Sequence, residues 1–277
     1  MEIKGWKYYN HAAIPITPPY QNPNVLPVEN GDIWSMEGYP LLVRYTTDFD
    51  CGFETNWWYV IKDTAFDLNS VKAKRRYEIN KGSKYFDVKL IDPCAYKTEL
   101  YCIQKAAFSV YPEKYRPQID QETFVRDIDN WKKFIVFGAF FRETEELVGY
   151  ALLSRATEQW IDFSVLKAHP QYEKYAINAA IVDKILRHFS DFLTDGGTIC
   201  DGARNINHET RFQDYLEKYF GFRKAYCHLH IIYHPRIKWV IRMLYPCKKL
   251  LQYFDSVKIV HNLNAVIKME EIVREKR

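Results

Sequence analysis

The chain has 277 residues, of which 47% are hydrophobic and 27% charged, and its formal net charge is +4. This composition excludes a disordered protein and is typical of one large globular domain or slightly more. No run of about 18 apolar residues occurs, which excludes an ordinary membrane-spanning helix. Residues 1–6 lack the apolar run of a secretory signal, so we expect none.

The charge is unevenly distributed along the chain. Residues 236–277 contain ten Lys or Arg and four Asp or Glu, so this segment carries +6 and residues 1–235 carry −2. A basic tail indicates an acidic partner, such as a membrane surface, a nucleic acid or an acidic protein. Of these we consider an anionic membrane or tRNA, and no DNA. Six cysteines without Cys-x-x-Cys spacing predict free thiols. We therefore expect a cytoplasmic protein, with the tail available for peripheral contact at the inner membrane face.

Residues 1–84 are predicted to form an N-terminal extension. Prolines at 15, 18, 19, 23, 27 and 40 predict an extended arm without helix, and apolar runs at 41–45 and 57–61 predict strands. A helix is predicted over residues 69–81, with Asn69 or Ser70 as its cap and Gly82 just past its end. Its basic face fits either a solvated surface or a phosphate or tRNA contact: Lys72, Lys74, Arg75, Arg76 and Lys81.

Residues 85–235 are predicted to form a mixed α/β domain. Antiparallel strands come first, and a helix connecting two parallel strands comes later, which predicts a mixed sheet flanked by helices. Residues 160–168 and 198–201 are predicted to be adjacent parallel strands joined by a helix that begins near Tyr175. The other predicted strands are 86–91, 134–141, 147–154 and 225–234, and the other helices 98–110, 121–131 and 211–219.

The turn after the strand at 160–168 is the stretch that most resembles a site. Apolar residues recur at helical spacing from Ile177 to Phe189, so a helix begins where the strand ends. The unpaired N–H groups and positive dipole end of such a helix attract anionic ligands.

This order of elements resembles the GNAT superfamily of N-acetyltransferases. Residues 170–181 align without a gap with that family's coenzyme A loop, and residues 215–222, which end in Tyr219-Phe220-Gly221-Phe222, resemble its closing signature. At the loop's usual glycine positions this chain has Lys174, Ala176 and Asn178, and one extra residue precedes Gly221. Glycine lets the backbone approach a phosphate closely, so these departures bear on coenzyme A binding.

The basic segment at residues 72–82, followed by an apolar strand, is similar to a segment of the Fem-type peptidoglycan aminoacyltransferases. That branch has a GNAT-type fold with few loop glycines and a Tyr/Phe-Gly ending. The two resemblances together cover roughly residues 70–235. They imply a degenerate GNAT-like member near the Fem-type branch.

The GNAT resemblance implies roles for particular residues. A backbone N–H near Val165, Leu166 or Lys167 would stabilise the oxyanion, and Tyr215 would protonate the leaving group, with Tyr219 as the alternative. Both tyrosines also fit ordinary core packing. The cofactor phosphates would lie at the loop and helix start: Lys174, Tyr175, Ala176, Ile177 and Asn178.

For the general base we consider Glu158 and Asp162 on the central strand, Asp201 at the end of the next strand, and His208 in the loop that follows. Asp162 is the most informative of these candidates for a functional role, because a carboxylate within an apolar strand is costly unless it is paired. A salt bridge explains Asp162 equally well, and a helix cap explains His208. The cysteine and histidines at 227–234 lack ligand spacing, so we predict no metal.

Residues 236–277 are predicted to form a basic amphipathic helical tail. We expect Trp239, Ile241 and Leu244 to be buried against the domain. The alternative is that the helix lies in a membrane interface with its basic side chains on lipid phosphates.

The resemblances imply an N-acyltransferase that moves an acyl group, acetyl above all, from acetyl-CoA or another acyl-CoA to a small amine acceptor. An amino sugar or another cell-envelope precursor is the acceptor class considered. Two alternatives stay open. One is Fem-type transfer from aminoacyl-tRNA, and the other is a GNAT-shaped binding protein without activity, which the missing glycines favour.

Overall fold

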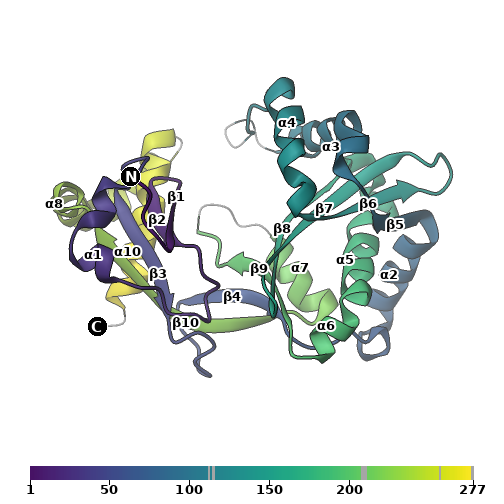
Figure 1. The fold of residues 1–277 in the computed structure, drawn as a ribbon, viewed down its shortest axis with the longest axis horizontal. Coiled ribbons are helices and arrows are strands. Elements are labelled where there is room, and N and C mark those ends of the chain that lie inside the picture. Colours follow the sequence, from purple (N-terminus) through teal and green to yellow (C-terminus); the bar gives the residue numbers. More distant parts are fainter. Residues whose placement is uncertain (112, 114–115, 207–210, 256, 276–277) are drawn as a thin grey trace. The chain divides into compact units, whose positions relative to one another are not determined.

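The computed structural model describes residues 1–111, 113, 116–206, 211–255 and 257–275 (Figure 1). The chain packs into two compact units. One, here called the terminal unit, contains Met1–Tyr59, Ala203–Thr210 and Lys224–Arg277, and the other, the central unit, contains Val60–Gly202 and Arg211–Arg223. These two units are defined by which residues pack together. The predicted domains, residues 1–84, 85–235 and 236–277, were defined by the order of sequence motifs, and that division stays a prediction.

The central unit is built on a mixed sheet. Neighbours from β5 to β8 pair antiparallel, whereas β8 and β9 pair parallel. Together with its flanking helices, this sheet confirms the predicted fold class. Strand β4 (Trp57–Lys62) begins in the terminal unit and ends in the central one. The other strands, in the order β9-β8-β7-β6-β5, are Thr198–Ala203, Trp160–Ala168, Leu147–Thr157, Ile135–Phe141 and Phe86–Leu90.

Helices cover both faces of this sheet (Figure 1). Tyr150 of β7 packs with Leu100 of α3 (Lys97–Ser109), whereas the neighbouring Gly149 lies against Ile177 of α5 (Ile177–His188). Adjacent strand residues point to opposite faces, so α3 and α5 lie on opposite sides. The unit also contains α2 (Ala73–Tyr85), α4 (Gln121–Asp127), α6 (Ser190–Thr194), α7 (Arg211–Phe220) and short 3-10 helices at Leu68–Ser70, Pro93–Tyr96, Ile128–Lys133 and Pro170–Tyr175.

The predicted connection between the two parallel strands is confirmed. Residues 160–162 of β8 pair with residues 198–200 of β9, and α5 lies between these strands in the sequence. The helix begins at Ile177, two residues after the predicted start. Ile177, Ile181 and Ile185 are completely buried, so the apolar periodicity correctly identified the face of α5 that packs on the sheet.

The basic segment forms its helix later than predicted. The prediction was residues 69–81 with Gly82 past the end, but α2 spans Ala73–Tyr85 and contains Gly82. Gly82 does not end the helix, because it serves a close contact between two helices. A Cβ at Gly82 would lie 2.6 Å from the carbonyl oxygen of Ala176 and 3.0 Å from the amide nitrogen of Ala180. The missing side chain therefore lets α2 touch the first turn of α5.

The terminal unit contains a second, smaller set of strands. β1 (Trp6–Tyr9) and β2 (Ala12–Pro15) form an antiparallel pair, and β2 pairs parallel with β3 (Leu42–Thr47). β3 in turn pairs antiparallel with β10 (Arg223–Tyr233), whose first residue belongs to the central unit. The chain thus completes this sheet with strands from both ends of the sequence.

The proline-rich arm is less extended than predicted. It contains a four-residue helix α1 (Leu26–Glu29) and a 3-10 helix at Asp32–Ser35. Pro27 lies in the first turn of α1, where the missing N–H costs nothing, so proline there does not exclude helix. The arm contributes core residues to the terminal unit, among them Val28 and Ile33, which are 6% and 0% exposed.

The tail after β10 is helical, as predicted, with α8 (Pro235–Leu244), α9 (Lys248–Tyr253) and α10 (Lys258–Arg274) joined by a short 3-10 helix at Tyr245–Cys247. Ile241 is 4% exposed, which confirms the expected burial at that position, and Leu244 is half-buried. Trp239 is 66% exposed, so the expectation that it packs on the domain is wrong. Among the described helices none is long and apolar enough to cross a membrane.

We predict that Gly82→Ala destabilises the protein by about 1–3 kcal/mol, the usual cost of inserting a methyl group into a filled space. Its Cβ would meet backbone atoms of α5, which cannot rotate away as a side chain can. Urea unfolding monitored by circular dichroism measures the loss. The exposed neighbour Ser83→Ala in the same helix is the matched control, and equal stability of both variants would contradict the close contact.

Candidate active site

The strands β8 and β9 are paired over only part of their length. Their parallel ladder joins Trp160 to Thr198, Ile161 to Ile199 and Asp162 to Cys200, and within the described residues it ends there. β8 continues to Ala168 while paired with β7 on its other edge. The edge of β8 beyond Asp162 therefore has no ladder to β9, and its backbone groups are available for other partners.

A β-bulge lies at the point where the two strands separate. Leu152 of β7 pairs with Val165, and the next residue, Leu153, pairs with Phe163, so Ser164 has no counterpart in the register. Ser164 is exposed. A bulge bends its strand and changes the direction of the neighbouring backbone groups, and bulges are common beside active sites.

The three strand residues predicted to bind the cofactor, Val165, Leu166 and Lys167, follow this bulge and are half-buried. The side chain of Val165 packs against the apolar cluster that includes α3. The Nζ of Lys167 lies 4.4 Å from the ring centre of Phe108, also in α3. Two of the three side chains thus face α3, which leaves the backbone as the part of this segment suited to a ligand.

The predicted phosphate loop keeps a glycine-like backbone without its glycines. Ala176 has φ = 63°, a left-handed conformation that glycine adopts more easily, and α5 begins directly after it. The first N–H groups of α5, at Ile177 and Asn178, lack partners within the helix. Lys174 is exposed with its Nζ 5.0 Å from the ring centre of Tyr175, a half-buried residue.

Two buried polar atoms flank the same turn. His169 Nδ1 and Asn178 Oδ1 have no hydrogen-bond partner in the part of the chain that the structure describes. His169 follows the last residue of β8, and Asn178 lies in the first turn of α5. A buried polar group without a partner is costly, so polar groups of bound water or of a ligand would be stabilising here.

Helix α7 holds the predicted acid in an aromatic cluster. The ring centre of Tyr215 lies 4.5 Å from that of Tyr219 and 5.7 Å from that of Phe220. Burial, with a smaller contribution from Glu78, raises the pKa of Tyr215 well above its ordinary value, against the influence of Arg75. Tyr215 is therefore a neutral hydrogen-bond donor at physiological pH.

Tyr219, the alternative acid, is engaged by α2. The guanidinium of Arg75 lies 3.7 Å from the centre of the Tyr219 ring, and Arg75 also donates a hydrogen bond to the hydroxyl oxygen. Burial first, and then Glu78, raises the pKa of Tyr219, whereas Arg75 lowers it. Since its hydroxyl already has these partners, Tyr219 supports the cluster, and Tyr215 stays the better candidate for the acid.

Asp201 has the electrostatic properties of a general base. It lies on β9 just after the last ladder pair, where burial raises its pKa to about 7, although a hydrogen bond with Gln213 of α7 lowers it. A base with a pKa near 7 accepts and releases protons most effectively at neutral pH. Asp201 was considered from the sequence, but only its surroundings distinguish it from the other carboxylates.

The other predicted bases are placed differently. Asp162 lies at the last ladder pair, and its carboxylate accepts a hydrogen bond of 2.8 Å from the indole Nε1 of Trp160. Glu158 is exposed and lies in the turn before β8, not on the strand as expected. The length of β8, roughly 26 Å at 3.3 Å per residue, separates Glu158 from the α5 turn. His208 lies outside the described residues.

The packing of α7 brings part of the predicted site together. Phe212 contacts Phe163 of β8 with ring centres 6.1 Å apart, and Gln213 bonds to Asp201 of β9. Tyr215 belongs to the same helix, so the candidate acid and Asp201 are attached to one packed substructure. A further buried charged residue, Lys62, had no sequence signal. It is 3% exposed and its Nζ donates to Thr64 Oγ1 over 2.6 Å.

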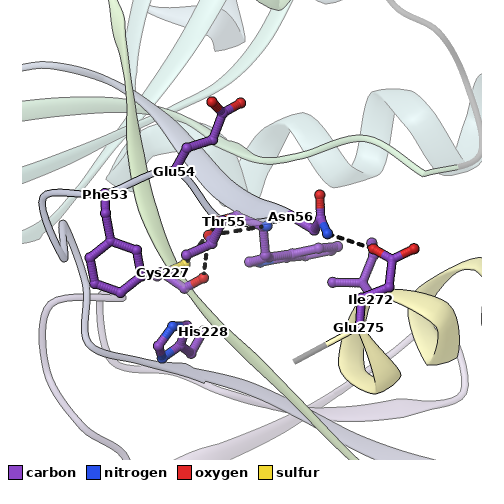
Figure 2. Close-up of a pocket in the computed structure, with 9 residues that line it drawn as sticks. Phe53, Glu54, Thr55, Asn56, Cys227, His228, Ile272 and Glu275 are labelled. Carbon is purple, nitrogen blue, oxygen red and sulfur yellow. Dashed lines mark hydrogen bonds between the residues drawn. The ribbon is translucent and has the colours of Figure 1, made fainter. Parts of the chain in front are cut away.

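A pocket of about 220 Å³ lies in the terminal unit (Figure 2). The amide of Asn56 points to Glu275 and donates to its carboxylate over 2.5 Å, and the Thr55 hydroxyl bonds to the carbonyl oxygen of Cys227 over 2.8 Å. His228 at the rim pairs with Asp48. None of the residues predicted from the GNAT resemblance lines this pocket.

Among the described residues no group of His, Cys, Asp or Glu is arranged to hold a metal ion.

No protein-family model matches the sequence, and no curated protein matches it. Solved structures do resemble the fold. They include L-PGS from Bacillus licheniformis, with a TM-score of 0.53, 13% identity, and coverage of 86% of this chain and 83% of that chain. The C-terminal domain of an Agrobacterium fabrum protein assigned as a lysylphosphatidylglycerol synthetase has a TM-score of 0.51, 10% identity, and coverage of 86% and 82%.

FemX is also similar, with a TM-score of 0.51, 9% identity, and coverage of 85% of this chain and 85% of that chain. At such low sequence identities, similarity to these solved structures establishes the fold alone. The chain has a GNAT-like fold and resembles Fem-type and lysylphosphatidylglycerol-synthetase structures, in agreement with the resemblance found in the sequence.

We predict that Asp201 makes stability fall as the pH rises from about 4 to about 7. Its pKa is 3.8 in the reference state and about 7 in the fold. Between these values the folded chain binds one proton more than the unfolded chain, so the free energy of unfolding decreases by at most about 4 kcal/mol. Urea unfolding across this range should show a slope that Asp201→Asn removes. The exposed Asp195→Asn should keep the slope, and a slope unchanged in Asp201→Asn would contradict the assignment.

Proposed function

We propose that this protein is an N-acyltransferase, which moves an acyl group from an activated carrier to an amine. One observation carries the proposal. Along one edge of β8 in the central unit, the ladder to β9 ends at Asp162, a bulge lies at Ser164, and α5 begins after the turn that follows the strand. Together these features present backbone N–H groups to a ligand, as transfer through an oxyanion requires.

In the proposed reaction the amine nitrogen attacks the carbonyl carbon of the carrier ester or thioester. Backbone N–H groups near Val165 to Lys167 stabilise the oxyanion that forms. Asp201, with its pKa of about 7, accepts the proton that the amine loses. The bond from the carbonyl carbon to the carrier then breaks, and Tyr215 donates a proton or a hydrogen bond to the leaving sulfur or oxygen.

For the carrier we propose acyl coenzyme A, with acetyl as the acyl group. The support is the start of α5, where N–H groups without helical partners attract a pyrophosphate. The left-handed Ala176 gives the turn the backbone shape that glycine provides elsewhere, and the exposed Lys174 adds positive charge.

The second candidate carrier is aminoacyl-tRNA, and the packing of α2 favours it. Gly82 brings α2 into contact with Ala176 and Ala180, which occupies one side of the turn where a pyrophosphate would bind. The same helix region exposes Lys72 and Lys74, which suit contacts to an RNA backbone. A similar structure is named for the synthesis of lysylphosphatidylglycerol, an aminoacylated lipid, and this name supports an aminoacyl donor.

Calorimetry distinguishes the two carriers. We predict that acetyl-CoA binds and that Lys174→Glu weakens binding, because a positive charge beside the pyrophosphate becomes negative. Lys184→Glu, an exposed residue farther along α5, is the matched control and should bind as the unaltered protein does. Heat with lysyl-tRNA and none with acetyl-CoA or longer acyl-CoA would select the second carrier. No heat with any of them would favour a binding protein without activity.

We predict that Tyr215→Phe lowers turnover on the order of 100-fold, because a general acid contributes at least that much. The ring stays in place, so the free energy of unfolding should change by only about 1 kcal/mol. Thiol release from acetyl-CoA, with a panel of amines as acceptors, measures turnover. Tyr219→Phe, which also loses one hydroxyl of α7, is the control, and a larger loss in that variant would move the role to Tyr219.

A further inference from the structure

The tail exposes an unusual amount of apolar surface. Trp239, Met243 and Tyr253 are 66%, 72% and 89% exposed. Single exposed apolar residues are ordinary, but a concentration in one segment marks an interaction site. The described residues of the segment 236–259, here called the apolar tail segment, also expose Val240, Leu250, Phe254, Val257 and Ile259.

Helix α8 is apolar on two sides, and only one of them is covered. Ile241 is buried, and Ile237 and Leu244 beside it are half-buried, which attaches the helix to the rest of its unit. Trp239 and Met243, four residues apart, share another face, and that face is exposed. The second face is therefore available for a partner while the helix stays folded in place.

Basic side chains predominate around this face, and the one acidic residue of the segment, Asp255, is paired with His261. Residues 235–254 contain five Lys or Arg and no Asp or Glu. Lys248 is paired with Glu271 over 2.6 Å. The other four are exposed and have no carboxylate partner in the part of the chain that the structure describes: Arg236, Lys238, Arg242 and Lys249.

We propose that the apolar tail segment docks on an anionic lipid surface, with its apolar side chains in the interface and its four unpaired basic side chains on lipid phosphates. Apolar and basic residues together are the signature of helices that lie in a membrane interface. Trp239 suits that boundary, and the Arg242 guanidinium lies 5.7 Å from its ring centre, which keeps a charge beside it. This partner goes beyond the transferase proposal and does not depend on it.

The same observations disfavour two other occupants. An RNA would neutralise the basic residues but would leave Met243, Leu250 and Val257 in water, so it matches only half of the surface. A second copy of the chain would cover the apolar residues but would bring like charges together, which is unfavourable. An anionic membrane satisfies both the apolar and the charged parts.

Vesicle co-sedimentation of the full chain tests the docking. We expect binding to vesicles of equal parts phosphatidylglycerol and phosphatidylcholine, and little to phosphatidylcholine alone. Raising the salt from about 0.1 M to about 1 M should weaken binding, because the Debye length falls from about 10 Å to about 3 Å. The triple variant Lys238→Glu, Arg242→Glu, Lys249→Glu should lose at least about fivefold in partition for each basic charge removed.

Two matched variants give the proposal its specificity. Lys132→Glu, Lys133→Glu, Lys184→Glu changes the net charge equally at exposed sites outside the tail and should keep most of the binding. Trp239→Ser with Met243→Ser removes the apolar contact without altering charge and should weaken binding at high salt most. Circular dichroism should show all variants folded, since each altered side chain is exposed.

Several outcomes would contradict docking on an anionic lipid surface. No sedimentation with anionic vesicles, or an equal loss in the tail and control triple variants, would overturn the proposal. Dimerisation in solution that disappears in Trp239→Ser, without vesicle binding, would assign the face to a second copy. Retention by tRNA and not by vesicles would assign it to RNA. Because none of these measurements involves acyl transfer, their failure leaves the proposed reaction untouched.

Discussion

The short parallel ladder between β8 and β9 is the constraint on which the central unit depends. Parallel neighbours need a crossover connection, and α5 is that connection. Its buried stripe, which includes Ile181, fixes the helix against the sheet, and this in turn fixes where its first turn lies. Had the ladder continued to Ala168, β9 would have occupied the edge of β8. Because it stops at Asp162, a polar edge and a helix start are both left for a ligand.

Burial gives the two candidate catalytic side chains different properties. A low-dielectric environment disfavours charge, which raises the pKa of both Asp201 and Tyr215. For the carboxylate, the result is a base balanced between its two forms near neutral pH. For the phenol, it is a hydrogen-bond donor that stays neutral at physiological pH. Arg75 opposes the shift at Tyr215, so in the reaction we propose it would lower the cost of negative charge on the phenol oxygen.

Much of the central unit could be predicted from local patterns. Apolar periodicity identified α5 and its buried face, and alternating elements predicted the parallel pair. The end of α2 was predicted too early, because glycine often follows the last turn of a helix, and only the distance from Gly82 to Ala176 shows that it serves a contact between helices instead. The left-handed backbone conformation of Ala176 could not be predicted either. Alanine gives no sign of the left-handed conformation that the tertiary structure imposes.

The candidate site shows the same limit more sharply. The sequence analysis placed Glu158 on the central strand, but it lies in the turn before the strand, and the length of β8 separates it from the α5 turn. Asp201 and Asp162 are chemically identical in a sequence. They differ because Asp162 accepts a bond from Trp160, whereas burial dominates at Asp201. Such differences arise from packing between elements that are distant in the chain, and local sequence periodicity does not predict that packing.

In the tail, the apolar pattern of the sequence and the packing of the fold disagree at Trp239. A helix that is apolar on more than one side needs more than one neighbour. Ile241 is buried within the fold, whereas Trp239, two residues away on another face, is left 66% exposed by the described residues. Leaving such surface in water is unfavourable in proportion to its area. The absence of carboxylates between residues 235 and 254 then restricts which surface can cover it, because a neutral apolar partner would leave the basic side chains without counter-charge.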